Sequence, residues 1–354
     1  MKRVSTVQLA FSFVGVFLGA GFVSGQELWQ FFACFGPLGF LGFFLATGLC
    51  LLVVYALLRL AQKTHCANVG ALIQPADLPW LRKLVDLLQC LLLFGIVVIM
   101  IAGATALLQS LTGLPAPICG ILFSLVLLPA ALFEVRGIVT AFSVLVPVTA
   151  VAAVILGVTI LFRQNFQLAP ATGTVSSLLP NWWISGITYA AYNLFGALGM
   201  LVPFAALVRD RQTIRRGLSL GAVLFLILTF GILASLMAVP GSGSEELPTA
   251  ALARQLHPIF GTVYDMLMAL GMFSAALASL IALVQQAGFH WPVLQRRRRS
   301  FLVLFLAAAY GLSLAGFGNL ISIVYPIFGY VGIPLLILLV RNWIKSRKQP
   351  AAES

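Results

Sequence analysis

The chain consists of long apolar runs separated by short polar or basic segments. Most of the runs reach about 20 residues, the length that an α-helix needs to cross a hydrocarbon core roughly 30 Å thick. Charged residues make up 8% of the 354 residues, whereas soluble domains carry about 25% to coat their surface. We therefore expect an all-α, polytopic membrane protein in which 1–354 form a single membrane domain.

Ten apolar segments predict ten transmembrane helices. They cover 5–35, 38–62, 81–112, 115–134, 137–163, 181–208, 214–239, 259–288, 300–316 and 319–343. With ten crossings and a cytoplasmic N-terminus, every Lys and Arg except Arg163 and Arg254 falls on the cytoplasmic side, as the positive-inside rule requires. The prediction is therefore a plasma (bacterial inner) membrane protein with both termini in the cytoplasm and a cytosolic tail at 344–354.

The net charge of +12 follows from the same distribution. Basic runs such as 296–299 are expected to anchor the topology against anionic lipid headgroups, so we expect the lipid bilayer as a partner and no nucleic acid. The five cysteines show no paired spacing and the three histidines are scattered, so neither a metal site nor a cofactor is expected. An intramembrane enzyme would need a cluster of catalytic groups at membrane depth, and we expect only the isolated Glu27 and Asp265 there, since Asp86 and Glu134 lie near the cytosolic ends of their segments.

The first segment contains features that disfavour a continuous helix. Four glycines fall within eleven residues near its middle: Gly15, Gly19, Gly21 and Gly25. Each glycine costs about 1 kcal/mol relative to alanine in a helix interior, and a carboxylate such as Glu27 costs at least ~2.5 kcal/mol at membrane depth. We expect an opened helix here. Close helix packing through small residues is the alternative, but it does not explain Ser24, Gln26 and Glu27 at that depth.

The sixth segment shows a similar pattern. Tyr189, Tyr192 and Asn193 precede three residues that weaken a helix: Gly196, Gly199 and Pro203. Segments 1 and 6 open two halves of five helices each, at 5–163 and 181–343. Discontinuous helices at matching positions of two halves are typical of a transporter's binding site, so we expect both segments to be interrupted around one shared site.

At such a break, backbone groups lose their helical partners. The amides from Phe22 to Gln26 could hold an anionic group of a solute, and the carbonyls from Val16 to Gly19 suit a cation. The candidate substrate-binding residues are Gly19, Ala20, Gly21, Phe22, Ser24, Gly25, Gln26, Glu27, Tyr189, Tyr192, Asn193 and Gly196.

Three stretches, VGVFLGAGFVSGQELWQFF, MIAGATALLQ and ITYAAYNL, resemble the YkvI-like bacterial membrane proteins. These are related to branched-chain amino acid carriers and to the wider amino acid–polyamine–cation superfamily with the LeuT fold. The resemblance implies two inverted five-helix repeats, here 5–163 and 181–343. It also implies secondary active transport of a small solute, such as an amino acid or an amine, by alternating access around a central site.

The resemblance leaves the coupling ion open between a proton and sodium. Sodium-coupled relatives place adjacent hydroxyl residues on helix 8, where this chain has Ser274 followed by Ala275, which supplies no oxygen. Burial favours the neutral form of a carboxyl group, so Glu27 is a candidate for proton exchange. The candidate ion-coupling residues are Val16, Gly19, Glu27, Ser274 and Asp265.

Apolar residues recur with helical spacing in the outer segment 245–258, which predicts a short amphipathic helix. In LeuT-like proteins the equivalent segment acts as an extracellular lid, whereas an ordinary interfacial helix is the alternative reading. A second alternative concerns function. The chain could be a membrane receptor that binds a solute without moving it, and the missing hydroxyl on helix 8 is the feature that favours this reading.

Overall fold

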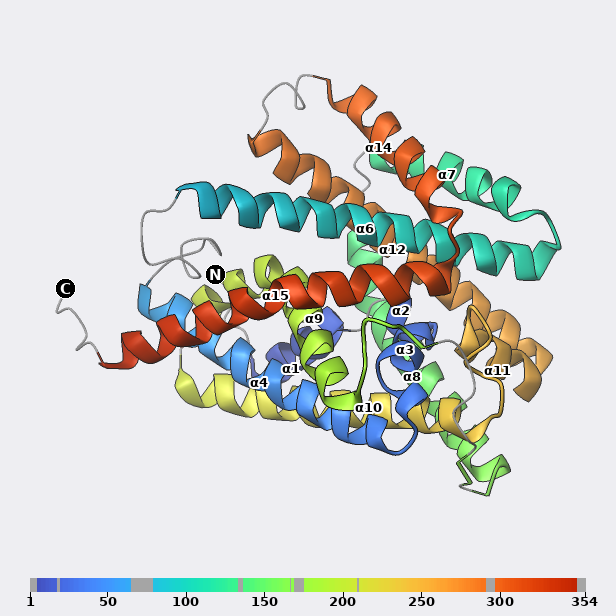
Figure 1. The fold of residues 1–354 in the computed structure, drawn as a ribbon, viewed down its shortest axis with the longest axis horizontal. Coiled ribbons are helices and arrows are strands. Elements are labelled where there is room, and N and C mark those ends of the chain that lie inside the picture. The colour runs from blue at the N-terminus through green and yellow to red at the C-terminus, as the bar shows by residue number, and fades with distance from the viewer. Residues whose placement is uncertain are drawn as a thin grey trace.

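The structure is a computed structural model that describes residues 5–17, 20–64, 79–132, 136–165, 167–168, 175–208, 210–290 and 297–348. The described elements are helical, and several of the long helices run roughly along the longest axis of the molecule (Figure 1). In chain order they are α1 (Thr6–Phe17), α2 (Ala20–Val23), α3 (Gln26–Phe31), the 3₁₀ turn η1 (Ala33–Phe35), α4 (Leu38–Thr64), α6 (Pro79–Thr112), α7 (Ala116–Leu132), α8 (Arg136–Arg163), α9 (Trp182–Leu207), α10 (Arg211–Ala238), α11 (Pro248–Leu256), α12 (Pro258–His290), α14 (Arg298–Ser313) and α15 (Phe317–Lys348).

The predicted apolar segments correspond to these helices within a few residues at each end. Five of the described helices are long and apolar enough to cross a membrane: Leu38–Thr64, Lys83–Thr112, Arg211–Ala238, Pro258–Gly288 and Phe317–Ser346. Their outward faces carry large apolar side chains, as lipid contact requires. The all-α membrane fold is therefore confirmed, and the count of ten crossings stays a prediction.

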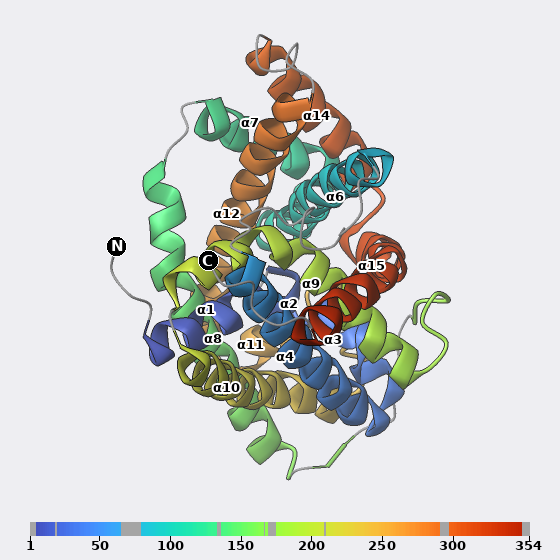
Figure 2. The ribbon, with the colours of Figure 1, turned by 90° about the vertical axis from the view of Figure 1, so that its left-hand side faces the viewer.

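The predicted interruption of the first segment is present. Its described residues form three separate short elements, α1, α2 and α3, and α2 and α3 are separated by Ser24 and Gly25. The elements α2 and α3 lie inside the bundle, and α1 lies nearer its edge (Figure 2). Together they contact α9, α10, α12 and α15. All six residues of α3 are buried.

The predicted interruption of the sixth segment is wrong. One continuous helix, α9, covers Asn193, Gly196, Gly199 and Pro203. A mid-helix glycine costs only about 1 kcal/mol, which does not by itself open a helix. The polar side chain of Asn193 also needs no break in the helix, because it donates its amide to the carbonyl of Tyr189 one turn earlier, at 3.1 Å. In membrane helices, neighbouring helices and local adjustments also compensate for a proline.

Small residues let several helix pairs approach backbone to backbone. A Cβ atom on Gly186 of α9 would meet the carbonyl of Gly42 in α4 at 2.5 Å. At the crossing of α8 and α10, a Cβ on Gly157 would overlap the carbonyl of Gly231, whereas a Cβ on Gly231 would meet no atom within 4 Å. Close approach through small residues is how membrane helices gain packing energy without a hydrophobic driving force.

This asymmetry generates a prediction. Gly157→Ala should lower the thermal stability of the purified protein, by about 1–3 kcal/mol, because overpacking forces two backbones apart. Gly231→Ala, at the same crossing, should leave stability unchanged or slightly raised. A dye that reacts with cysteines on unfolding can report this, because Cys50, Cys90 and Cys119 are buried. Equal effects of the two substitutions would contradict the packing described here.

Candidate functional site

The break in helix 1 depends on Gly25. Its backbone has φ 79° and ψ −15°, a left-handed conformation that glycine adopts at little cost. A Cβ atom there would also lie 2.7 Å from the methyl group of Thr249 and 3.3 Å from the side chain of Leu236. Both conformation and space therefore require glycine at the point where the chain turns from α2 into α3.

The backbone groups at the break are satisfied by other parts of the protein. The amide of Thr249, in the first turn of α11, donates to the carbonyl of Ser24 at 3.1 Å. The Thr249 hydroxyl donates to the carbonyl of Val23 at 2.6 Å, and the Tyr264 hydroxyl of α12 donates to the same oxygen at 2.8 Å. The carbonyls that the break releases thus bind α11 and α12 directly.

The predicted solute-binding amides at the break also have protein partners. The amide of Gly25 donates to the carbonyl of Phe22 at 3.1 Å. The amide of Gln26 donates to the hydroxyl of Ser24 at 3.3 Å, and that hydroxyl donates to the carbonyl of Gly21 at 2.7 Å. In this conformation, hydrogen bonds within the break occupy both of these amides.

The side chain of Glu27 lies at the centre of the site and is 3% exposed. Tyr192 of α9 donates its hydroxyl to one carboxylate oxygen, and the side chains of Tyr189 and Asn193 lie beside the same group. The other carboxylate oxygen faces Gly21, where a Cβ atom would approach it to 2.8 Å. The structure therefore brings together Gly21, Glu27 and the polar residues of α9, as the sequence predicted.

Aromatic rings form the walls around this carboxylate. Tyr325 of α15 stacks on Tyr192 with ring centroids 4.5 Å apart and planes 10° apart. Phe31 packs against Tyr189 and Tyr192 with centroids 5.3 Å and 5.6 Å away. Faces of aromatic rings attract cations, most strongly when the cation is desolvated.

Within the described residues, no Lys, Arg or His makes an ion pair with Glu27. An isolated buried carboxylate is costly in a medium of low polarity, so it takes up a proton or binds a cation. Beside it, the side-chain carbonyl of Gln26 is buried without a hydrogen-bond partner in the described part of the chain, while its amide nitrogen packs against Gly318 of α15. The site thus offers a carboxylate and an amide oxygen, both acceptors.

Other predicted site residues lie elsewhere. Phe22 stacks on Phe225 of α10, with centroids 5.7 Å apart, and Gly196 faces Leu92 of α6. Ser274 is buried within α12. Gly19 lies outside the described residues, and so do the side chains of Val16 and Ala20.

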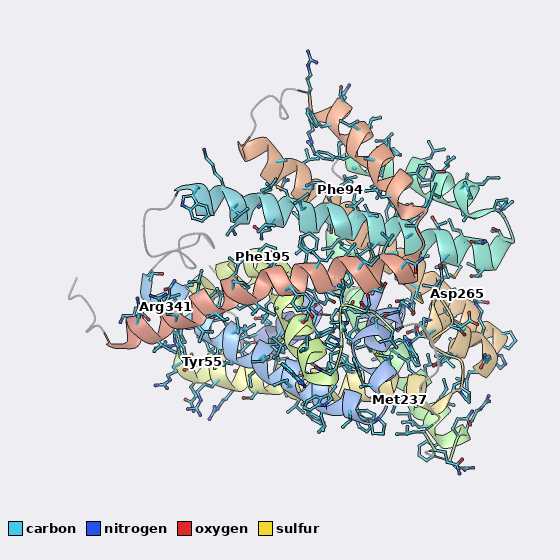
Figure 3. The ribbon with its side chains drawn as sticks, in the orientation of Figure 1. Tyr55, Phe94, Phe195, Met237, Asp265 and Arg341 are labelled. Carbon is cyan, nitrogen blue, oxygen red and sulfur yellow. The ribbon has the colours of Figure 1, made fainter. Side chains whose placement is uncertain are left out.

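Asp265 is bonded to a partner of its own. Both of its carboxylate oxygens accept from Arg254 of α11, at 2.8 Å and 3.1 Å, and Arg254 also donates to the hydroxyl of Ser110 in α6 at 2.8 Å. This ion pair ties α11 to α12 and α6, which fits the role of an interface residue. Figure 3 places Asp265 at the end of the bundle where α11 lies.

The loop before α11 is also held in place. Glu246 approaches Gly316, whose φ is 91°, and accepts a hydrogen bond from the backbone N–H of Phe317 at the start of α15. Burial raises the pKa of the Glu246 carboxyl group, and the Phe317 N–H opposes that shift. Together with Arg254, this contact fixes α11 over the break. The predicted short helix in 245–258 is therefore confirmed as α11.

Comparison with known proteins supports the membrane assignment. No family model matches the chain. The chain is 27% identical over 343 residues to the uncharacterized membrane protein YkvI of Bacillus subtilis (strain 168), with 95% of each sequence covered. It is 26% identical to the uncharacterized protein YyaD of the same organism, over 94% of this chain and 96% of that protein. The predicted resemblance to YkvI-like proteins is confirmed.

Solved structures identify the fold. Mhp1 in its inward-facing conformation matches with a TM-score of 0.63 at 13% identity, covering 98% of this chain and 78% of Mhp1. MhsT in complex with L-phenylalanine matches with a TM-score of 0.60 at 18% identity, covering 96% and 89%. A manganese transporter of Eremococcus coleocola matches with a TM-score of 0.57 at 13% identity, covering 95% and 78%. The chain has the LeuT fold.

Three residues of this site are not indicated by the sequence pattern: Thr249, Tyr264 and Tyr325. Each lies on an element far from helix 1 in the chain, so its contact with the site arises only in the folded protein. The strongest available signal was for Tyr325, which precedes Pro326 within an otherwise apolar segment.

The shared carbonyl of Val23 generates a second prediction. Thr249→Val and Tyr264→Phe each remove one of its two donors, so each alone should cost about 0.5–1.5 kcal/mol of stability. The double variant removes both and should cost more than the sum, because a buried acceptor then loses both hydroxyl donors. Melting temperatures of the three variants in detergent test this.

The matched control is Thr159→Val, which makes the same chemical change at a residue that bonds only within its own helix. Strict additivity of the Thr249 and Tyr264 substitutions would show that the two hydroxyls do not share this carbonyl.

Proposed function

We propose that the chain is a secondary active transporter of a small solute that carries an amino group, such as an amine or an amino acid. The solute binds where helix 1 is broken, against α9 and α15, and alternating access exposes this site to each side of the membrane in turn. The observation that carries the proposal is the buried carboxylate of Glu27, which has no cationic partner among the described residues.

The chemistry of the site favours a protonated amine. An ammonium group supplies the positive charge that Glu27 needs and several N–H donors, for which the carboxylate and the unpartnered oxygen of Gln26 are acceptors. The rings of Phe31, Tyr192 and Tyr325 surround the carboxylate and keep water from it, which strengthens its attraction for an ammonium group. Charge balance then suggests coupling: Glu27 holds a proton when the site is empty and releases it when the ammonium binds.

Sodium is the alternative coupling ion. Its support is the hydroxyl of Ser274 on α12, and its weakness is Ala275 beside it, because a sodium ion needs several oxygen ligands. The proteins of similar fold do not decide between these options, since one is solved in complex with L-phenylalanine and another is a manganese transporter. The choice of an amine and a proton therefore rests on the residues around Glu27.

The proposal includes the architecture that the fold implies. Ten crossings form two inverted five-helix repeats at 5–163 and 181–343, with both termini and the tail 344–354 in the cytoplasm of the plasma membrane. The helix α11 then lies on the outer side and acts as the lid. A receptor that binds the solute without moving it is the second candidate function, and the continuous α9 favours it, because helix 1 is opened and α9 is not.

The first test of this function is Glu27→Gln in proteoliposomes. A panel of labelled amines and amino acids is assayed for uptake across a range of pH. The wild type should accumulate at least one of them in a pH-dependent manner. Glu27→Gln should abolish the pH dependence and reduce uptake, because the amide neither ionises nor balances an ammonium charge.

Asp210→Asn is the matched control, since it makes the same acid-to-amide change at an exposed helix cap that asparagine also fills well. Uptake by Glu27→Gln with the wild-type pH profile would remove Glu27 from the coupling step. Binding without accumulation by the wild type would favour the receptor.

A second test fills the space beside the carboxylate. A methyl group on Gly21 would lie 2.8 Å from a Glu27 oxygen and 3.5 Å from the Tyr325 hydroxyl. Gly21→Ala should therefore weaken solute binding by about ten-fold, which corresponds to the lower part of the usual cost of overpacking, and Gly21→Leu should block it. Gly15→Ala is the control in the same helix 1 segment, because a Cβ there meets nothing within 4 Å. Thermal-shift titrations with the solute provide the measurement, and equal affinities for the two alanine variants would contradict the assignment.

A further inference from the structure

A groove lies on the outside of the bundle, and none of its lining residues belongs to the site described above. It has a volume of about 360 Å³ and lies between α4, α9 and α15. Its walls are apolar side chains such as Leu52, Ile333 and Ile337, its floor includes Ala190 and Ala191, and Arg341 lies among its lining residues. Leu52 and Ile337 are 45% and 61% exposed, so the groove opens toward the surroundings of the bundle.

Helix packing closes this groove at both ends. At one end α15 touches α9 backbone to backbone, because Gly329 packs on Thr188 and Gly332 packs on Ala191. Past this crossing, bulky side chains replace glycine on α15 and the space between the helices opens.

At the other end α4 and α15 meet again. The ring of Tyr55 packs against Trp343 at a centroid distance of 5.9 Å, and Lys63 donates a hydrogen bond to the carbonyl of Ser346. Figure 3 shows Tyr55 and Arg341 near the same end of the bundle.

The groove has the length of one lipid leaflet. From Ile333 to Ile344, the lining residues of α15 span about 16 Å of helix at 1.5 Å per residue. That is roughly half of a hydrocarbon core of about 30 Å. Ile333, Ile337 and Arg341 follow each other at four-residue spacing on one face of the helix, and Lys345 continues the row.

The charge at the end of the groove is positive and unbalanced. Arg341 and Lys345 are exposed, and no ion pair joins either of them to a carboxylate in the described part of the chain. Arg211 is also close to this end, because it donates to the Tyr55 hydroxyl at 3.0 Å. An apolar channel that ends in a group of cations complements a molecule with an acyl chain and an anionic head.

We infer that this groove is a binding site for an anionic phospholipid, with one acyl chain along Leu52, Ile333 and Ile337 and the phosphate at Arg341 and Lys345. The lipid comes from the leaflet on the basic side of the membrane. It braces α15 against α4 and α9. Of these helices, α15 carries Tyr325 and α9 carries Tyr189 and Tyr192 of the central site. Membrane surfaces of this charge attract basic residues near them, and the groove adds a fixed place for the chain.

Native mass spectrometry of the full-length protein tests this inference. The protein is incubated with equal amounts of phosphatidylglycerol and phosphatidylcholine, and bound lipid is counted at increasing collision energy. The wild type should retain phosphatidylglycerol in preference to phosphatidylcholine. Arg341→Gln should lower the retained phosphatidylglycerol about five-fold, the contribution of one basic residue near an anionic membrane surface.

Two further variants distinguish lipid binding in the groove from a general electrostatic attraction between lipid and basic residues. Arg299→Gln removes a cation from the exposed start of α14, outside the groove, and should retain lipid as the wild type does. Leu52→Trp should fill the groove and lower retention of both lipids with the basic residues intact. If a thermal melting curve shows that Leu52→Trp does not fold, Ile337→Phe is used in its place.

Equal losses in Arg341→Gln and Arg299→Gln would overturn the inference, because the attraction would then be a diffuse surface effect. Equal retention of the two lipids by the wild type would also overturn it. A third outcome would overturn it as well: the wild type is a dimer that retains no lipid, and Leu52→Trp converts it to a monomer. A second copy of the chain would then occupy the groove.

Discussion

A peptide group that loses its helical partner inside a membrane finds no water to bond with, so an opened helix is stable only where other parts of the protein bond it. The break in helix 1 meets this requirement through Thr249 and Tyr264, which donate to the carbonyls of Val23 and Ser24. The break, α11 and α12 therefore depend on one another. A change in the position of α11 changes the hydrogen bonding of the break, and the carboxylate of Glu27 lies only a few residues further along the chain.

The same requirement explains why two segments of the chain with similar patterns of glycine and polar residues fold differently. Segments 1 and 6 both combine glycines with polar residues at mid-span, and both were predicted to open. In segment 1, Gly25 adopts a left-handed conformation and α11 and α12 supply donors to the released carbonyls. In segment 6, the Asn193 side chain bonds within its own helix and α9 stays continuous. Whether glycines open a helix thus depends on partners from distant segments, which a local pattern does not contain.

Much of the fold was predictable from the sequence because apolar length and basic loops follow directly from the thickness and charge of a membrane. The core of the site was also predictable, since Gly21 and Glu27 are neighbours in sequence and Tyr189 and Tyr192 share one segment. Tyr325 was not, because its contact with Tyr192 arises from the packing of α15 on α9. Arg254 shows the same limit: the charge pattern of the loops does not reveal its partner Asp265, which lies on the following helix.

The arrangement of these contacts bears on how a transport cycle could run. Glu27 is 3% exposed, so in this conformation the carboxylate must be neutral or balanced by a bound cation. Release of α11 would leave the carbonyls of Val23 and Ser24 without their partners, but it would also admit water that can bond them, so the cost of opening is partly offset. Water would at the same time stabilise an ionised Glu27. Opening of α11 and ionisation of Glu27 therefore favour each other, and closure favours either a proton or an ammonium at the carboxylate. Under the proposed function, this mutual dependence couples the movement of a charged solute to the movement of a proton.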